Sequence, residues 1–214
     1  MQRLILLALE VLLITVAGFV DAVGFLNLGH LFVSFMSGNS TQLAIGLERG
    51  SWAEIAPAGG IVGLFTAGVV IGSLLMAANR HGRRPFVLGA EAILLAVSAS
   101  ISAQKGFEIS AMVFAMGMQN AILRTGDFAT RSRTYVTGTL VHFGEALADA
   151  VTSQASPKLC LSYLSLWLGL ILGGGLGAWA FGEFGIRALL APAAILFALC
   201  ALAVTPAFNR HPSG

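Results

Sequence analysis

Long apolar runs separated by short polar or basic segments dominate this chain. Six of the runs are long enough to cross a membrane, and they cover residues 4–28, 55–78, 86–103, 109–123, 160–181 and 186–206. A membrane-spanning helix needs about 20 apolar residues to cross the hydrocarbon core. The pattern therefore predicts an all-α integral membrane protein with six transmembrane helices.

The composition points the same way. Hydrophobic residues make up 57% of the chain and charged residues only 10%, whereas soluble domains are about 25% charged. A core of this size cannot bury so much apolar surface, so the lipid bilayer is the expected partner. The net charge of +2 is too small to indicate nucleic acid as a partner.

Two further stretches, residues 30–50 and 126–157, are semi-apolar and interrupted by glycine, serine and threonine. The first contains SGNST at residues 37–41, and the second contains TGT at residues 137–139. Such residues are typical of helix starts. We expect each stretch to enter the membrane extended, turn at its glycine and leave as a short re-entrant helix that begins near mid-membrane.

Four matches at nearly one offset indicate an internal duplication. GFVDA at 18–22 aligns with GMQNA at 117–121, and SGN at 37–39 aligns with TGT at 137–139. GVVIG at 68–72 aligns with GGGLG at 173–177, and AILLA at 92–96 aligns with AILFA at 194–198. We interpret the chain as one membrane domain, residues 1–214, with repeat 1 at about 1–104 and repeat 2 at about 105–214.

The basic residues predict how the halves are oriented. If both interrupted stretches re-enter, nine of the twelve Lys and Arg residues lie on one face, which the positive-inside rule makes cytoplasmic. These nine are Arg3, Arg80, Arg83, Arg84, Arg124, Arg131, Arg133, Lys158 and Arg210. Both termini are then cytoplasmic in a bacterial inner membrane. Three crossings per half make the second half inverted, an architecture common among transporters.

A candidate binding site lies where the two short helices begin. Open backbone N–H groups at a helix start favour an anionic or strongly polar ligand, and an intramembrane carboxylate is by default a functional candidate. The intramembrane carboxylate here is that of Asp21. The alternative is that the two turns only pack helices together and that Asp21 is hydrogen-bonded to a loop. The predicted substrate-binding residues are Asp21, Ser37, Gly38, Asn39, Ser40, Asn120, Thr137, Gly138 and Thr139.

Other polar residues carry weaker signals. His142, Glu145 and Asp149 share one helix face, where they could hold a metal or relay a proton. A wet helix end at the membrane face is the favoured explanation, because charge is ordinary there. Glu91 lies near the basic turn at residues 80–84 and could form an ion pair with it. We expect no enzyme, cofactor or metal, because no nucleophile–base pair, P-loop or dinucleotide fingerprint is present.

The signature GFVDAVGF at 18–25, followed by Phe32 and SGN at 37–39, resembles the YoaK-like family of small bacterial integral membrane proteins. GMQNA at 117–121 and YVTG at 135–138 resemble the second signature of that family. Ser37 departs from the pattern, where we expect threonine, but it keeps the hydroxyl group. The resemblance implies a permease-like protein of the plasma membrane without an assigned substrate.

We therefore expect a permease-like transporter of a small polar or anionic solute. The competing class is a non-transporting membrane protein, such as a sensor or an assembly factor, in which the broken stretches are purely structural. Six crossings are few for a transporter that works by alternating access, which is compatible with a homodimer.

Overall fold

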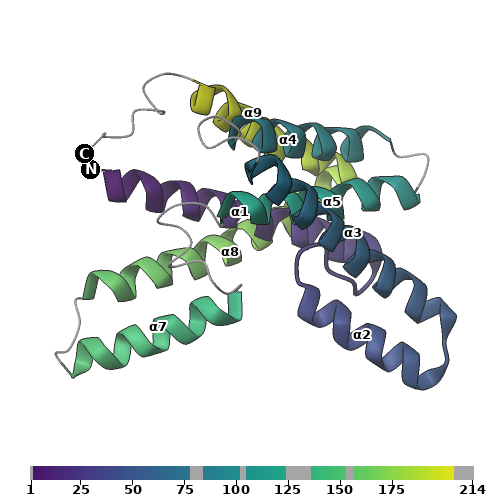
Figure 1. The fold of residues 1–214 in the computed structure, drawn as a ribbon, viewed down its shortest axis with the longest axis horizontal. Helices are drawn as coiled ribbons and strands as arrows, with labels where there is room; N and C mark the ends of the chain where they lie inside the picture. Colours follow the sequence, from purple (N-terminus) through teal and green to yellow (C-terminus); the bar gives the residue numbers. More distant parts are fainter. Residues whose placement is uncertain (1, 78–83, 102–104, 124–135, 153–156, 205–214) are drawn as a thin grey trace.

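The computed structural model describes residues 2–77, 84–101, 105–123, 136–152 and 157–204, and these residues form helices joined by short loops (Figure 1). Among the described residues there is no β-strand, so the all-α prediction holds for them. In chain order the helices are α1 (Gln2–Leu28), α2 (Met36–Arg49), α3 (Trp52–Ala77), α4 (Arg84–Ser100), α5 (Lys105–Leu123), α7 (Val136–Val151), α8 (Pro157–Phe184), the 3-10 helix η1 (Gly185–Leu189) and α9 (Leu190–Val204).

Within the part of the chain that the structure describes, three helical stretches are long and apolar enough to cross a membrane, namely Leu4–Leu28, Trp52–Ala77 and Lys158–Val204. The six transmembrane helices and their inverted arrangement stay a prediction. The last of the three stretches is 47 residues long, more than twice the length that about 20 residues need for one crossing. It bends at Gly185, whose φ of 59° lies in the left-handed region that glycine adopts without steric cost. The bend separates α8 from α9, so this stretch is two helices rather than one.

Glycines allow α1 and α8 to cross in direct backbone contact. A Cβ atom added at Gly18 would overlap the carbonyl oxygen of Leu170, and one added at Gly173 would overlap the carbonyl oxygen of Thr15. Small residues that let backbones touch are the usual basis of helix packing in membranes, where lipid and side chains are equally apolar. The pair lies side by side through the middle of the structure (Figure 1).

A second glycine crossing joins α3 and α5. A Cβ atom at Gly68 would overlap the carbonyl oxygen of Phe114, and one at Gly117 would overlap that of Phe65. The repeat alignment equates Gly18 with Gly117, and the GVVIG motif of α3 with the GGGLG motif of α8. The two crossings thus use glycines that the predicted repeat aligns, and each joins a helix of the predicted first repeat to a helix of the predicted second repeat.

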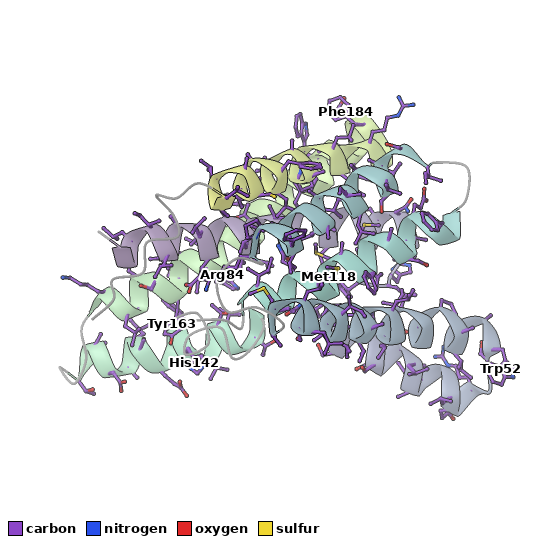
Figure 2. All side chains as sticks on the ribbon, turned by 45° about the horizontal axis from the view of Figure 1, so that its top comes forward. Trp52, Arg84, Met118, His142, Tyr163 and Phe184 are labelled. Atoms are coloured by element: carbon purple, nitrogen blue, oxygen red, sulfur yellow. The ribbon has the colours of Figure 1, made fainter. Side chains whose placement is uncertain are left out.

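The two short helices lie in opposite parts of the structure. α2 packs against α3, and α7 packs against α8. Both begin near the middle and run outward in opposite directions, α7 toward the end where α1 begins (Figure 1). His142 of α7 accordingly lies at one end of the structure, and Trp52, just beyond α2, lies at the other (Figure 2).

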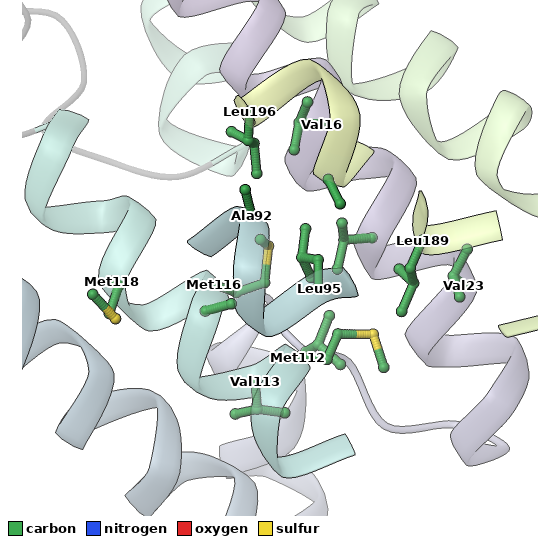
Figure 3. Packing of buried hydrophobic residues seen from close by; sticks show 14 of the residues in the cluster. Val16, Val23, Ala92, Leu95, Met112, Val113, Met116, Met118, Leu189 and Leu196 are labelled. Atoms are coloured by element: carbon green, nitrogen blue, oxygen red, sulfur yellow. The ribbon is translucent and has the colours of Figure 1, made fainter. Parts of the chain in front are cut away.

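The best-packed part of the core lies among α4, α5 and α9. Leu95 of α4, Met112 of α5 and Leu196 of α9 are fully buried in one cluster (Figure 3). By contrast, α3 and α8 expose large apolar side chains along much of their length, including Leu74 and Leu172. Extensive apolar exposure on long helices is expected where the neighbour is lipid.

The basic residues behind the orientation prediction lie largely outside the described part of the chain. Arg80, Arg83, Arg124, Arg131, Arg133 and Arg210 all belong to those segments. The cytoplasmic placement of both termini therefore stays a prediction.

Candidate functional site

The loop between α1 and α2 turns back into the protein. Gly29 and His30 both adopt positive φ, 61° and 103°, and the Gly29 N–H donates to the Phe25 carbonyl at 3.0 Å. Positive φ is costly for a residue other than glycine unless its surroundings hold it there. Here the edge of the His30 ring packs against Phe25, with the centroids 5.9 Å apart, and the following residues lead to a buried segment.

Asp21 of α1 fixes that segment. Its Oδ1 accepts hydrogen bonds from the backbone N–H groups of Val33 at 2.9 Å and Ser34 at 2.8 Å. Its Oδ2 accepts one from the Ser34 hydroxyl at 2.6 Å. Val33 is fully buried and Ser34 nearly so, which means that no water replaces these bonds. The carboxylate therefore satisfies two loop amides that would otherwise be costly inside the protein.

Asn39 closes the loop from the other side. Its Nδ2 donates to the Phe32 carbonyl at 2.6 Å, and its Oδ1 accepts from the Phe32 N–H at 2.9 Å. The side chain thus pairs with both polar groups of one residue, much as a neighbouring strand would. Asn39 has no exposed surface, so this pairing is protected from water.

The short helices begin close to the predicted motifs, at Met36 and Val136, but two residues before the glycines at which the chain was expected to turn. α2 starts at Met36 after the N-cap residue Phe35, which makes no side-chain cap. Gly38 lies inside the first turn, and Gly138 likewise lies inside α7. The predicted turns at these glycines are therefore wrong. Asn39 reaches back to the loop from within the helix, and the reversal occurs earlier, at Gly29.

The second half can be compared only in part. Thr137, Gly138 and Thr139 lie in the first turn of α7, while residues 124–135, which precede them, lie outside the described part of the chain. Asn120, aligned with Asp21, donates from Nδ2 to the Met116 carbonyl of its own helix at 2.9 Å. The predicted extended entry into α7 thus remains a prediction.

Two further amide side chains, those of Asn27 and Gln119, bond to separate partners. Asn27 donates to the Glu108 carboxylate at 3.4 Å, and Gln119 donates to the Leu13 carbonyl at 3.2 Å. Both bonds link α1 to α5. They are interhelical ties at separate places along α1, so the structure uses these residues for packing.

His142 and Glu145 do form a pair. The His142 Nδ1 lies 2.9 Å from the Glu145 Oε2, and the His142 ring packs on Tyr163 of α8 with centroids 5.3 Å apart (Figure 2). Glu145 and Asp149 are exposed. No cluster of three metal-ligating side chains occurs in the described residues, so the described geometry fits a wet helix end better than a metal site.

Among the described residues, Glu91 does not pair with the basic turn, of which Arg80 and Arg83 lie outside the described part of the chain. Glu91 is fully buried in α4, and neither of its carboxyl oxygens has a hydrogen-bond partner among the residues that the structure describes. Arg84 opens the same helix seven residues earlier, which is about two turns or 10 Å along the axis. Sequence proximity to the arginines gave no indication of this burial.

Apolar helices that cross through glycine contacts, with an interior loop fixed by the polar side chains of Asp21 and Asn39, define a multi-pass membrane protein. Comparison with known proteins agrees. A family model described as "Protein of unknown function (DUF1275)" matches residues 9–202. The chain belongs to this family.

Two curated relatives carry the same class in their names. UPF0700 transmembrane protein RA0705 of Rhizobium meliloti is 33% identical over 206 residues, covering 96% of this chain and 87% of that protein. UPF0700 transmembrane protein YoaK of Bacillus subtilis is 30% identical over 161 residues, covering 70% of this chain and 71% of that protein. The resemblance to YoaK-like proteins is thereby confirmed. No solved structure matches the chain.

Proposed function

We propose that this protein is a permease-like transporter that moves a small polar or anionic solute across the bacterial inner membrane. The solute would bind where α2 begins, between two inverted halves of three crossings each. The observation that carries the proposal is a helix that starts next to an interior loop, which the partly buried Asp21 and the buried Asn39 hold in place.

The start of α2 has the chemistry of an anion site. No acceptor is present among the described residues for the backbone N–H groups of Ser37 and Gly38, and no side chain caps them. The side chains of Ser37 and Ser40 are exposed, which adds two hydroxyl groups at the same end. Unpaired N–H groups and the positive end of the helix dipole attract negative or strongly polar groups.

The arrangement of the halves supports alternating access. α1 crosses α8 and α3 crosses α5 through aligned glycines, so the two halves contact each other at equivalent positions. Close glycine contacts between helices are compatible with one half rocking against the other. The opposite directions of α2 and α7 fit an inverted second half (Figure 1).

One observation favours the competing class, a non-transporting sensor or assembly protein. Asp21 already accepts three hydrogen bonds from the loop, which leaves it less able to bind a solute directly. We therefore assign Asp21 a positioning role: it holds the start of α2 in place, while the backbone of Ser37 and Gly38 meets the solute.

The test is flux into liposomes that contain the purified protein, with a panel of small anionic and neutral polar solutes. Wild type is compared with Asp21→Ala, which frees the loop, and with Thr66→Val as a matched control. Thr66 is exposed on α3 and bonds only the Val62 carbonyl of its own helix at 2.7 Å. We expect flux in wild type and the control and at least a tenfold loss in Asp21→Ala.

Two outcomes would oppose the proposal. Flux that persists in folded Asp21→Ala would remove the loop from the mechanism. No flux for any solute, with all variants folded, would favour the non-transporting class.

A further inference from the structure

Glu91 is the most unusual charged residue in the described part of the chain. It lies in the middle of α4 and has no exposed surface, and no described group donates a hydrogen bond to either carboxyl oxygen. Buried apolar residues flank it on the same helix, among them Leu88, Ala92 and Leu95. Figure 3 shows Ala92 and Leu95 within the cluster formed with α5 and α9.

The described side chains of the helices that pack most closely on α4, namely α9 and α5, include no cation. Lys105 is the first residue of α5, three positions before Glu108, whose carbonyl meets Ser98 about two turns of α4 beyond Glu91. α9 has no charged residue, and its only ordinary titratable group, Cys200, contacts the Pro85 carbonyl at 3.1 Å, more than a turn before Glu91. The described acidic residue of α5 is Glu108. Its carboxylate accepts from Asn27, and its carbonyl accepts from a serine near the end of α4.

The described residues of η1, α3 and α4 itself provide no positively charged partner for Glu91 either. Arg187 of η1 is exposed, and Glu54, at the start of α3, forms an exposed ion pair with Arg49 at 3.4 Å. On α4 itself the described charged residue besides Glu91 is Arg84, at the first position of the helix. No described side chain therefore compensates a negative charge at Glu91.

An ionised carboxylate in such a place is prohibitively costly, because neither water nor a counter-ion stabilises it. The side chain must be neutral while the surrounding helices are closed. A carboxyl group differs from an amide of the same shape in one respect that matters here: it can release its proton once water reaches it.

The position of α4 between the two halves suggests how water could reach the Glu91 carboxyl group. α4 belongs to the first half of the chain, but it packs mainly against α9 and α5 of the second half. A movement that parted the first half of the chain from the second would part α4 from α5 and α9. Glu91 is thus buried at a contact between the halves rather than inside one of them.

We propose that Glu91 is a proton-binding site that is loaded when the halves close and opens to water when they separate. On opening, the carboxyl O–H bond breaks, its proton passes to a water molecule as hydronium, and the hydrated carboxylate remains. On closing, the carboxylate takes a proton back before it is buried. The coupling of this cycle to a solute rests on the proposed transport function, while the proton site itself does not.

Infrared spectroscopy of the full-length protein in nanodiscs tests the site without a known solute. At neutral pH we expect a carbonyl stretch of a protonated carboxyl group in wild type, its loss in Glu91→Gln, and its shift when water is replaced by heavy water. Glu91→Asp keeps a carboxyl group and provides a second variant if Glu91→Gln does not fold. Glu108→Gln is the matched control and should keep the band.

Each result decides the matter. A band that is absent from wild type, or one that Glu91→Gln retains, overturns the assignment. A band that never shifts in heavy water, while the amides of α4 exchange, shows a permanently sealed acid and also overturns it. A shifting band together with no solute flux would keep the proton site but remove support for transport, so the two failures are distinguishable.

Discussion

The hydrogen bonds from the α1–α2 loop to the Asp21 carboxylate give the sharpest stability prediction. Asp21→Ala removes the acceptor for the buried N–H groups of Val33 and Ser34. Leaving a buried donor unpaired costs about 1–3 kcal/mol, so the variant should lose about 2–6 kcal/mol unless the loop opens to water. Asp21→Asn keeps one carbonyl oxygen for both N–H groups, so its loss should be only about 1 kcal/mol.

Two measurements separate these outcomes. Thermal unfolding in nanodiscs gives the stability of each variant, and amide hydrogen exchange over residues 29–40 reports whether the loop has come free. We expect Asp21→Ala to unfold at the lowest temperature and to exchange fastest in this segment. Asn27→Ala is the matched control on the same helix, because Asn27 makes only one long bond, 3.4 Å, to Glu108.

Both variants remove the negative charge, but only Asp21→Ala removes the acceptor for the loop N–H groups. Equal stability of the two variants would therefore refute the reasoning, because it would show that the hydrogen bonds to these N–H groups do not contribute. The reasoning would also be refuted if the control destabilised the protein as much as Asp21→Ala. Unchanged exchange over residues 29–40 in Asp21→Ala would show that other contacts hold the loop.

Three further predictions use the same unfolding measurement. Gly173→Ala should cost about 1–3 kcal/mol through overpacking, because its Cβ overlaps a backbone carbonyl of α1, whereas Gly175→Ala, with open space around it, should be neutral or stabilising. Equal effects of the two would contradict the crossing. Asn39→Asp should destabilise by about 2 kcal/mol or more, because a carboxylate oxygen then faces the Phe32 carbonyl, and wild-type stability in this variant would show that the pairing is unimportant. Glu145→Gln should change stability by less than about 1 kcal/mol, because its pair with histidine is exposed, and a larger loss would indicate a structural role for that pair.

Much of the helical framework could be read from the sequence. A bilayer demands about 20 consecutive apolar residues for each crossing, and this demand acts on each segment separately, so the apolar runs coincide with the long helices. The glycines at positions 18, 68, 117 and 173 were also recognisable as a repeated pattern. Small residues at helical spacing have one main use in apolar helices, which is close packing.

The details of the loop and of Glu91 were decided only by tertiary structure. Serine, glycine and asparagine at residues 37–39 look like a helix start in isolation, but the partner of Asn39 is the Phe32 backbone, which the folded loop brings to it. Glu91 looked able to pair with the arginines before it, but the packing of α5 and α9 turns its face of α4 inward. The sequence by itself determined which segments are apolar enough to be helices, because that depends on local composition and a fixed membrane thickness. Which polar groups are buried, and which partners they meet, depends on how distant helices pack, and no local pattern records that.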